Sequence, residues 1–274
     1  MKVFRLFFTL FILTFVSLPL AVMAQDEEET LVVTSVNTRG WKSNTGSGGT
    51  LAIVSDPDPT SPALSGSLKL TTNNTVDAYA TYSHATETPI ADVSELSYWA
   101  KQNLASFADG NAAYFLRVCL DPLTSPVTDQ NPLGCTGYTS FIYEPYWNMS
   151  GGMSAWREYD VDAGQMWSSR SYSSGTCTVT AGAGGPPLYT LGAIQTACPN
   201  AVVVEFGVNI GTYNPSYDIS VDLVKFNNTT YDFEVYSTPT TAEDCKKGGW
   251  STFNPPAGQF KNQGQCVSST VPAN

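Results

Sequence analysis

Short runs of β-prone residues, separated by Gly, Pro, Asn and Asp, follow one another along most of the chain. Many short strands divided by turn residues are typical of two-sheet sandwiches. A doubly wound fold would need long amphipathic helices between the strands, and the sequence offers only one short helical segment, residues 190–197. We therefore predict an all-β fold, a two-sheet jelly-roll β-sandwich. The predicted strands are residues 31–36, 51–55, 67–72, 78–82, 95–101, 113–120, 139–146, 156–161, 202–210, 218–226 and 231–235.

The N-terminus has the composition of a secretory signal peptide. Lys2 and Arg5 form a positive start, residues 6–20 are apolar, and small residues precede a cleavage site after Ala24. No later segment approaches the roughly 20 apolar residues that a transmembrane helix needs. We expect residues 1–24 to be removed and the mature chain to be secreted and extracellular, without membrane insertion.

The charge balance limits the partners. The formal net charge is −11, and such an acidic surface repels nucleic acid and anionic lipid. We expect no nucleic-acid partner.

Six cysteines in an exported chain indicate a disulfide framework. Other pairings are open in principle, but pairing between sequence neighbours is the simplest. The expected bridges are Cys119–Cys135, Cys177–Cys198 and Cys245–Cys266. A zinc site is disfavoured, because the chain has no C-x-x-C spacing and its one histidine is His84.

The chain divides near its C-terminal end. Residues 237–243, STPTTAE, read as a linker between the sandwich and a small unit closed by the last two cysteines. The predicted domains are the sandwich at residues 25–236, the linker at 237–243 and the tail at 244–274.

Several segments resemble a known family. The stretches SGSLKLTT, ELSYWAKQN, WREYDVDAG and DISVDLVKF are similar to strands of galactose-binding-type jelly rolls, the fold of many carbohydrate-binding modules. The C-terminal part of the chain, with PNAVVVEFGVNIG followed by DCKKGGW and FKNQGQCVS, resembles bacterial secreted proteins of unassigned activity. The resemblance implies the fold far better than the function, because one fold can serve many functions.

Alternation along four strands predicts one mixed face. Side chains point alternately to the two sides of a strand, so apolar and mixed sets separate. The core-facing set includes Leu116, Val118, Tyr143, Val204 and Phe206. The mixed set is Trp99, Lys101, Arg117, Glu144, Tyr146, Glu205 and Asn209. Aromatic rings stack on sugar faces and polar groups bond hydroxyls, so this face would bind a polysaccharide or cell-surface glycan if the strands share a sheet.

Two other functions remain open. Glu144 and Glu205 could form the carboxylate pair of a glycoside-active enzyme, one as acid and the other as base or nucleophile. A serine-type triad would have to use His84, which has no nucleophile motif nearby. The third possibility is a structural or adhesive envelope protein without a small ligand. We take the non-catalytic glycan-binding protein as the leading hypothesis.

The jelly-roll resemblance also implies a structural calcium ion. Asp222 lies in the closing strand, where similar binding modules often supply a ligand, and Asp56 and Asp58 could join it from a loop. Calcium takes six to eight oxygen ligands, including carboxylates and backbone carbonyls. No other cofactor is expected.

Overall fold

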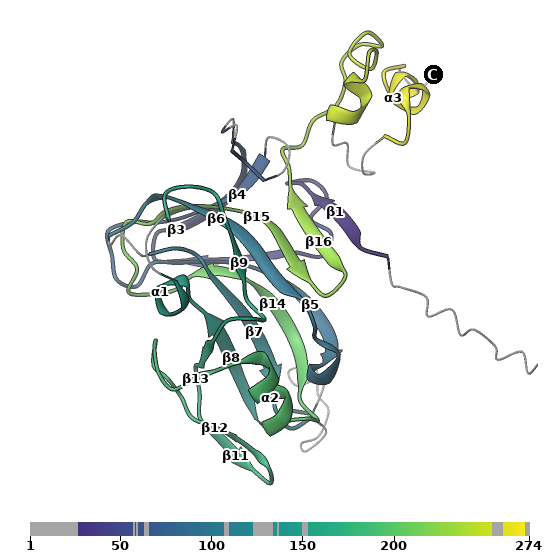
Figure 1. Cartoon of the computed structure of the whole chain (residues 1–274). Helices are drawn as coiled ribbons and strands as arrows, with labels where there is room; N and C mark the ends of the chain where they lie inside the picture. The colour runs from purple at the N-terminus through teal and green to yellow at the C-terminus, as the bar shows by residue number, and fades with distance from the viewer. Residues whose placement is uncertain are drawn as a thin grey trace, which may run out of the picture.

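The fold is known from a computed structural model, in which two β-sheets pack face to face (Figure 1). The described residues are 27–56, 58, 60–62, 66–106, 110–122, 134–135, 137–149, 153–253 and 260–271, so the predicted signal peptide lies outside them. Within this part of the chain, no helix is long and apolar enough to span a membrane.

One sheet, here called sheet A, is organised around the long strand β15, Asp218–Phe226. One edge of β15 pairs with β6 (Leu96–Leu104), which pairs in turn with β9 (Arg157–Asp160). The other edge pairs with two strands in succession. These are β4 (Gly66–Thr72), which continues to β3 (Gly49–Ser55), and β16 (Thr229–Phe233), which continues to β1 (Glu29–Val33).

The second sheet, sheet B, has the strand order β13-β10-β8-β7-β14-β5-β2. Its strands are β13 (Leu188–Tyr189), β10 (Met166–Ser168), β8 (Tyr138–Tyr143), β7 (Ala113–Cys119), β14 (Val202–Ile210), β5 (Tyr79–Pro89) and β2 (Lys42–Gly46). A separate hairpin joins β11 (Tyr172–Ser174) to β12 (Cys177–Val179). The two-sheet all-β prediction is confirmed, and every predicted strand overlaps an observed one.

The core lies between the two sheets. Leu116, Val118, Tyr143 and Phe206 are buried there, as alternation predicts. Val204 is an exception, because a β-bulge between Val203 and Glu205 inserts a residue into β14. Val203 therefore takes the core position, and the prediction for Val204 is wrong.

The predicted strand at residues 139–146 ends earlier than expected. β8 stops at Tyr143, and Pro145 begins the single turn α1, Pro145–Asn148. Proline cannot donate to a strand ladder but fits the first position of a helix. The chain therefore turns at Glu144 instead of continuing along the sheet.

The short helical segment forms as predicted. Helix α2 spans Leu191–Ala197, and the Thr190 hydroxyl accepts a hydrogen bond from the Ala193 amide at 3.2 Å. Two shorter 3₁₀ turns, η1 (Ile90–Asp92) and η2 (Gly249–Thr252), also occur. The buried side chains of Leu191 and Ile194 attach α2 to the sandwich core.

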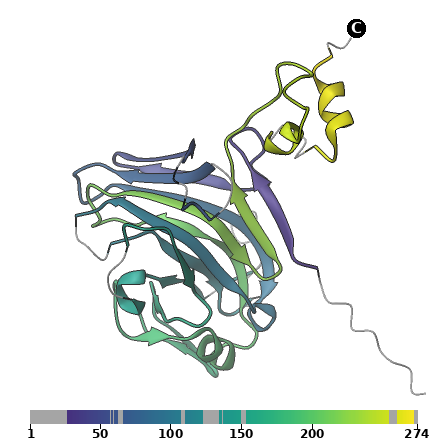
Figure 2. The ribbon, with the colours of Figure 1, turned by 45° about the horizontal axis from the view of Figure 1, so that its top comes forward.

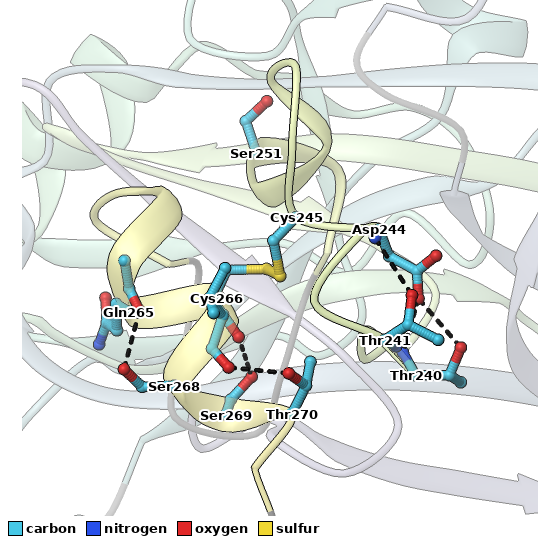
Figure 3. The surroundings of a disulfide bond; sticks show 12 residues. Thr240, Thr241, Asp244, Cys245, Ser251, Gln265, Cys266, Ser268, Ser269 and Thr270 are labelled. Atoms are coloured by element: carbon cyan, nitrogen blue, oxygen red, sulfur yellow. Dashed lines mark hydrogen bonds between the residues drawn. A yellow bond between two sulfur atoms is a disulfide. The ribbon is translucent and has the colours of Figure 1, made fainter.

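All three predicted disulfides form: Cys119–Cys135, Cys177–Cys198 and Cys245–Cys266. The last one closes the tail, where it links the turn before η2 to helix α3, Gln263–Ser269 (Figure 3). Asp244 stabilises this turn by accepting hydrogen bonds from the backbone amides of Thr240 and Thr241.

The tail has a small apolar cluster distinct from the sandwich core. Cys245, Phe260 and Cys266 are buried together, and Trp250 and Phe253 pack against them. In both views the tail lies beyond the sandwich, connected through the segment after β16 (Figures 1 and 2). Residues 237–243, the predicted linker, contain neither helix nor strand.

Candidate functional site

The predicted mixed face is divided between the two sheets. Arg117 and Glu205 pair directly across β7 and β14, on the outer face of sheet B, and form an ion pair. Trp99 and Lys101 lie on β6, which pairs with β15 and belongs to sheet A. The prediction of one shared face is therefore wrong for these two residues, because alternation fixes the side of a strand but not its sheet.

A cavity of about 550 Å³ lies at the end of sheet B that carries Glu144 and Asn209. Several loops meet there, since β8 and β14 end and β7 begins at this edge. Helix α1 marks the position in Figure 1. The principal lining residues are Asn111, Glu144, Tyr146, Trp167, Asn209, Tyr213 and Tyr217. Of the seven predicted ligand-binding residues, Glu144, Tyr146 and Asn209 belong to this cavity.

Several aromatic side chains line the walls and rim of the cavity. Trp167 pairs with Ile142 across β10 and β8, which directs it to the outer face of sheet B. Tyr146 and Tyr213 are 51% and 77% exposed, although large aromatic rings usually bury most of their surface. Two residues of α1, Tyr146 and Trp147, pack edge to face, with their ring centroids 4.9 Å apart. The rim thus presents apolar rings to solvent.

The backbone holds two of these rings in place. Tyr213 has φ 67, a left-handed conformation that is uncommon for a residue other than glycine. Its amide donates to the carbonyl of Val76 at 2.6 Å, which ties the β14–β15 loop to the β4–β5 loop. The Trp147 indole donates to the carbonyl of Gly184 at 2.9 Å. These contacts pre-organise the rim.

Glu144 is the charged residue among the described residues that line the cavity. Burial raises the pKa of its carboxyl, and the nearby indoles of Trp167 and Trp147 oppose this by lowering it. The Trp167 N–H lies close to the carboxylate but makes no hydrogen bond of normal geometry. The buried Oδ1 of Asn209 has no hydrogen-bond partner among the described residues. The cavity therefore offers a ligand one donor, the Trp167 N–H, and two acceptors, the Glu144 carboxylate and Asn209 Oδ1.

The two glutamates of the enzyme hypothesis lie on the same face but far apart. Glu205 is level with Arg117, whereas Glu144 follows Tyr143 and is level with Ala113 and Asn209. This register separates their Cα atoms by roughly 13 Å along the strands and roughly 10 Å across them. Glycosidase carboxylates lie within about 10 Å of each other, and Glu205 is also bound to Arg117. The arrangement is unsuited to a two-glutamate glycosidase.

The outer face of sheet A carries Lys101 in a different role. Its ammonium group bonds the carboxylates of Asp58 at 2.9 Å and Asp56 at 3.2 Å. The same ammonium lies 5.3 Å from the ring centre of Trp156. The predicted calcium ligands Asp56 and Asp58 are thus paired with Lys101, and they do not belong to the carboxylate group that contains Asp222.

Asp222 instead belongs to a cluster of three buried carboxylates with Asp232 and Glu234. One oxygen from each lies within 4.8 Å of the others. Asp222 Oδ1 accepts from the amides of Leu223 and Phe233 at 2.8 and 2.9 Å, while Asp222 Oδ2 and Asp232 Oδ1 have no partner among the described residues. Burial raises the pKa of Asp222 well above its usual range, with repulsion from Asp232 adding to it. Burial and the neighbouring Glu234 raise the pKa of Asp232 to about 7.

This donor set fits a hard cation. Carboxylate oxygens are the preferred ligands of Ca²⁺, and uncompensated buried carboxylates must otherwise hold protons. The sequence signal was present in the D-x-E pattern at the end of the last strand, β16. Asp232 and Glu234 alternate with Tyr231 and Phe233, whose side chains belong to the core. Sequence reasoning found Asp222 but missed these two partners.

Other cavity residues were also missed from sequence. Trp167 lies on a strand of three residues, too short to predict, and Tyr213 and Tyr217 lie in the loop after β14. The one available signal was the density of aromatic residues and Asn in the segment GTYNPSY.

Comparison with known proteins supports no family assignment. No protein-family model and no characterised sequence matches the chain. Among solved structures, the family 11 carbohydrate-binding module from Clostridium thermocellum is 13% identical, with a TM-score of 0.37 over 71% of this chain and 91% of that one. The β-1,2-glucanase from Parabacteroides distasonis is 10% identical, with a TM-score of 0.36 over 76% of this chain and 25% of that one. Similarities this low carry no argument about function.

Proposed function

We propose that the protein is a secreted, non-catalytic glycan-binding β-sandwich, with its site in the cavity at the end of sheet B. The observation that carries the proposal is the group of exposed aromatic rings around a cavity with buried polar groups. Tyr146, Trp167 and Tyr213 supply apolar faces, and Glu144 and Asn209 supply acceptors.

The physical reason is the dual character of sugars. A pyranose ring has an apolar face that stacks on aromatic rings and an equatorial set of hydroxyls that needs directed hydrogen bonds. A volume of about 550 Å³ lies within the usual range of ligand pockets. The separation between Glu144 and Glu205 supports binding without hydrolysis. The three disulfides support an oxidising, extracellular location.

A glycan array followed by calorimetry tests this proposal. The array identifies a glycan, and Trp167→Ala should then weaken its binding by about 1–3 kcal/mol through lost stacking and buried area. Trp99→Ala is a matched control, because it removes the same side chain from the outer face of sheet A. If no glycan binds, or if Trp99→Ala weakens binding as much as Trp167→Ala, the proposed site is wrong.

We also propose that Asp222, Asp232 and Glu234 hold a structural calcium ion. The proposal is supported by the two buried carboxylate oxygens without partners and by the short spacing of the three groups. Calcium would offset most of the negative charge of the cluster and link the end of β16 to the middle of β15. Calorimetric titration of chelator-treated protein with Ca²⁺ should detect binding that Asp222→Asn weakens at least tenfold. Equal binding by this variant would place the ion elsewhere.

A further inference from the structure

The cavity in sheet B has an unusual charge composition. Among the described residues that line it there is one carboxylate, Glu144, and no lysine, arginine or histidine. Two arginines, one on β7 and one just after β10, lie at a distance from it. Arg117 is bound to Glu205, and this pair lies four residues along the strands from the level of Glu144. Arg170 lies over the ring of Tyr138, a residue of β8 that is six positions before Glu144 in the sequence. Glu144 is therefore not neutralised by a basic side chain of the cavity wall.

The surroundings of Glu144 favour a cationic ligand. Aromatic rings attract a cation through their electron-rich faces, and the attraction grows where water is excluded. Trp167 lies close to the carboxylate, and Tyr146 and Tyr213 line the same cavity. The formal net charge of −11 also raises the local concentration of cations and lowers that of anions. A carboxylate within a group of aromatic rings, in an acidic protein, is the chemistry that recognises an ammonium group.

We propose that this cavity binds a glycan unit with a free amino group, an amino sugar of the glucosamine class within a polysaccharide, through an ion pair with Glu144. The inference rests on the proposed glycan-binding function and names the class of sugar. The ammonium group pairs with Glu144, and the sugar ring stacks on Trp167 or Tyr213. Asn209 Oδ1 accepts from a hydroxyl or from the ammonium group.

The same geometry discriminates between related sugars. An N-acetylated unit has no charge to pair with Glu144, and its acetyl group occupies space beside the aromatic rings. A uronate would place a second carboxylate near Glu144, and like charges in a partly buried site repel strongly. The expected order of affinity is amino sugar first, its N-acetylated form second and uronate last.

Calorimetry with three sets of oligosaccharides tests the inference on the full-length protein. Glucosamine, N-acetylglucosamine and galacturonate oligomers of equal length should be compared at a pH where the amine is protonated. We expect the glucosamine oligomer to bind at least tenfold more tightly than its N-acetylated form, and the galacturonate oligomer not to bind. Glu144→Gln should remove the preference while keeping the size of the side chain.

Controls separate recognition at the cavity from general attraction to an acidic protein. Glu158→Gln removes the same charge from an exposed position on β9 of sheet A and should leave the preference unchanged. Protonation of Glu144 should weaken glucosamine binding as the pH falls, and this pH dependence should be absent in Glu144→Gln. The melting temperature of each variant verifies folding. The comparison of the three oligosaccharides on the unmodified protein tests the inference even if a variant fails to fold.

The outcomes distinguish this inference from the broader proposal. If neutral or acidic oligomers bind as well as glucosamine oligomers and Trp167→Ala still weakens binding, glycan recognition stands and the amino-sugar inference is overturned. The same holds if Glu158→Gln and Glu144→Gln reduce the preference equally. If no oligomer or arrayed glycan binds, the proposed function itself is overturned.

Discussion

The carboxylate cluster of sheet A should make stability depend on pH in an unusual direction when calcium is removed. The pKa of Asp232 is about 7 in the folded protein, compared with about 3.9 for aspartate in an unfolded chain. The folded state therefore binds the proton more tightly than the unfolded state. The resulting stabilisation is complete below about pH 4 and is lost as the pH rises through about 7.

The size of the effect follows from this difference in pKa. About three units, at about 1.4 kcal/mol each, correspond to a loss of about 4 kcal/mol from Asp232 over this range. Asp222 has a raised pKa and adds in the same direction. For a domain of about 200 residues, 4 kcal/mol corresponds to a fall in melting temperature of roughly 8–16 °C.

Thermal unfolding in EDTA, between about pH 4.5 and about pH 7.5, measures the effect, and a parallel series contains Ca²⁺. We expect the melting temperature to fall with rising pH in EDTA, and calcium to reverse the fall, because the cation replaces the protons. Asp232→Asn should raise the melting temperature at the upper pH in EDTA, whereas Glu158→Gln, at an exposed position, should not. A flat pH profile in EDTA, with no response to calcium, would refute the reasoning.

Three further predictions concern β14, the tail and the sheet B ion pair. Gly207→Ala should destabilise the protein by about 1–3 kcal/mol in urea unfolding, because a Cβ there would lie 2.2 Å from the Tyr82 carbonyl oxygen. The control Gly192→Ala in α2 should be neutral or stabilising, because its Cβ would meet open space. Truncation after Tyr236 should leave the main melting transition within a few degrees, since the tail has its own apolar cluster; a large loss would mean that the tail supports the sandwich. Arg117→Ala should change the free energy of unfolding by no more than about 1 kcal/mol, because the ion pair with Glu205 is partly exposed, and a larger loss would indicate a stronger structural role.

Local patterns in the sequence were sufficient for most of the longer strands, for helix α2 and for the disulfides. Leu116 and Val118 could be assigned to the core because alternation is a property of the backbone of one strand. Thr190 could be assigned as a cap because its partner lies three residues away. The bridges could be predicted because each joins cysteines that are neighbours in sequence.

The candidate sites depended on contacts between distant segments, which these patterns do not contain. Trp99 and Arg117 have similar strand contexts, yet β6 pairs with β15 and β7 pairs with β14, so they lie on different sheets. The bulge at Val203 changed the face of Val204, because one inserted residue reverses the alternation. The cavity residues Glu144, Trp167 and Tyr213 come from three separate segments.

By itself the sequence determined that this is a disulfide-linked, all-β chain with aromatic and acidic residues on its outer faces. Only the tertiary structure decided that Glu144 shares a cavity with aromatic residues, that Lys101 pairs with Asp56 and Asp58, and that Asp222 meets Asp232 and Glu234. The physical reason is that side-chain periodicity is set within each strand, whereas the pairing of strands is set by the packing of the whole sandwich.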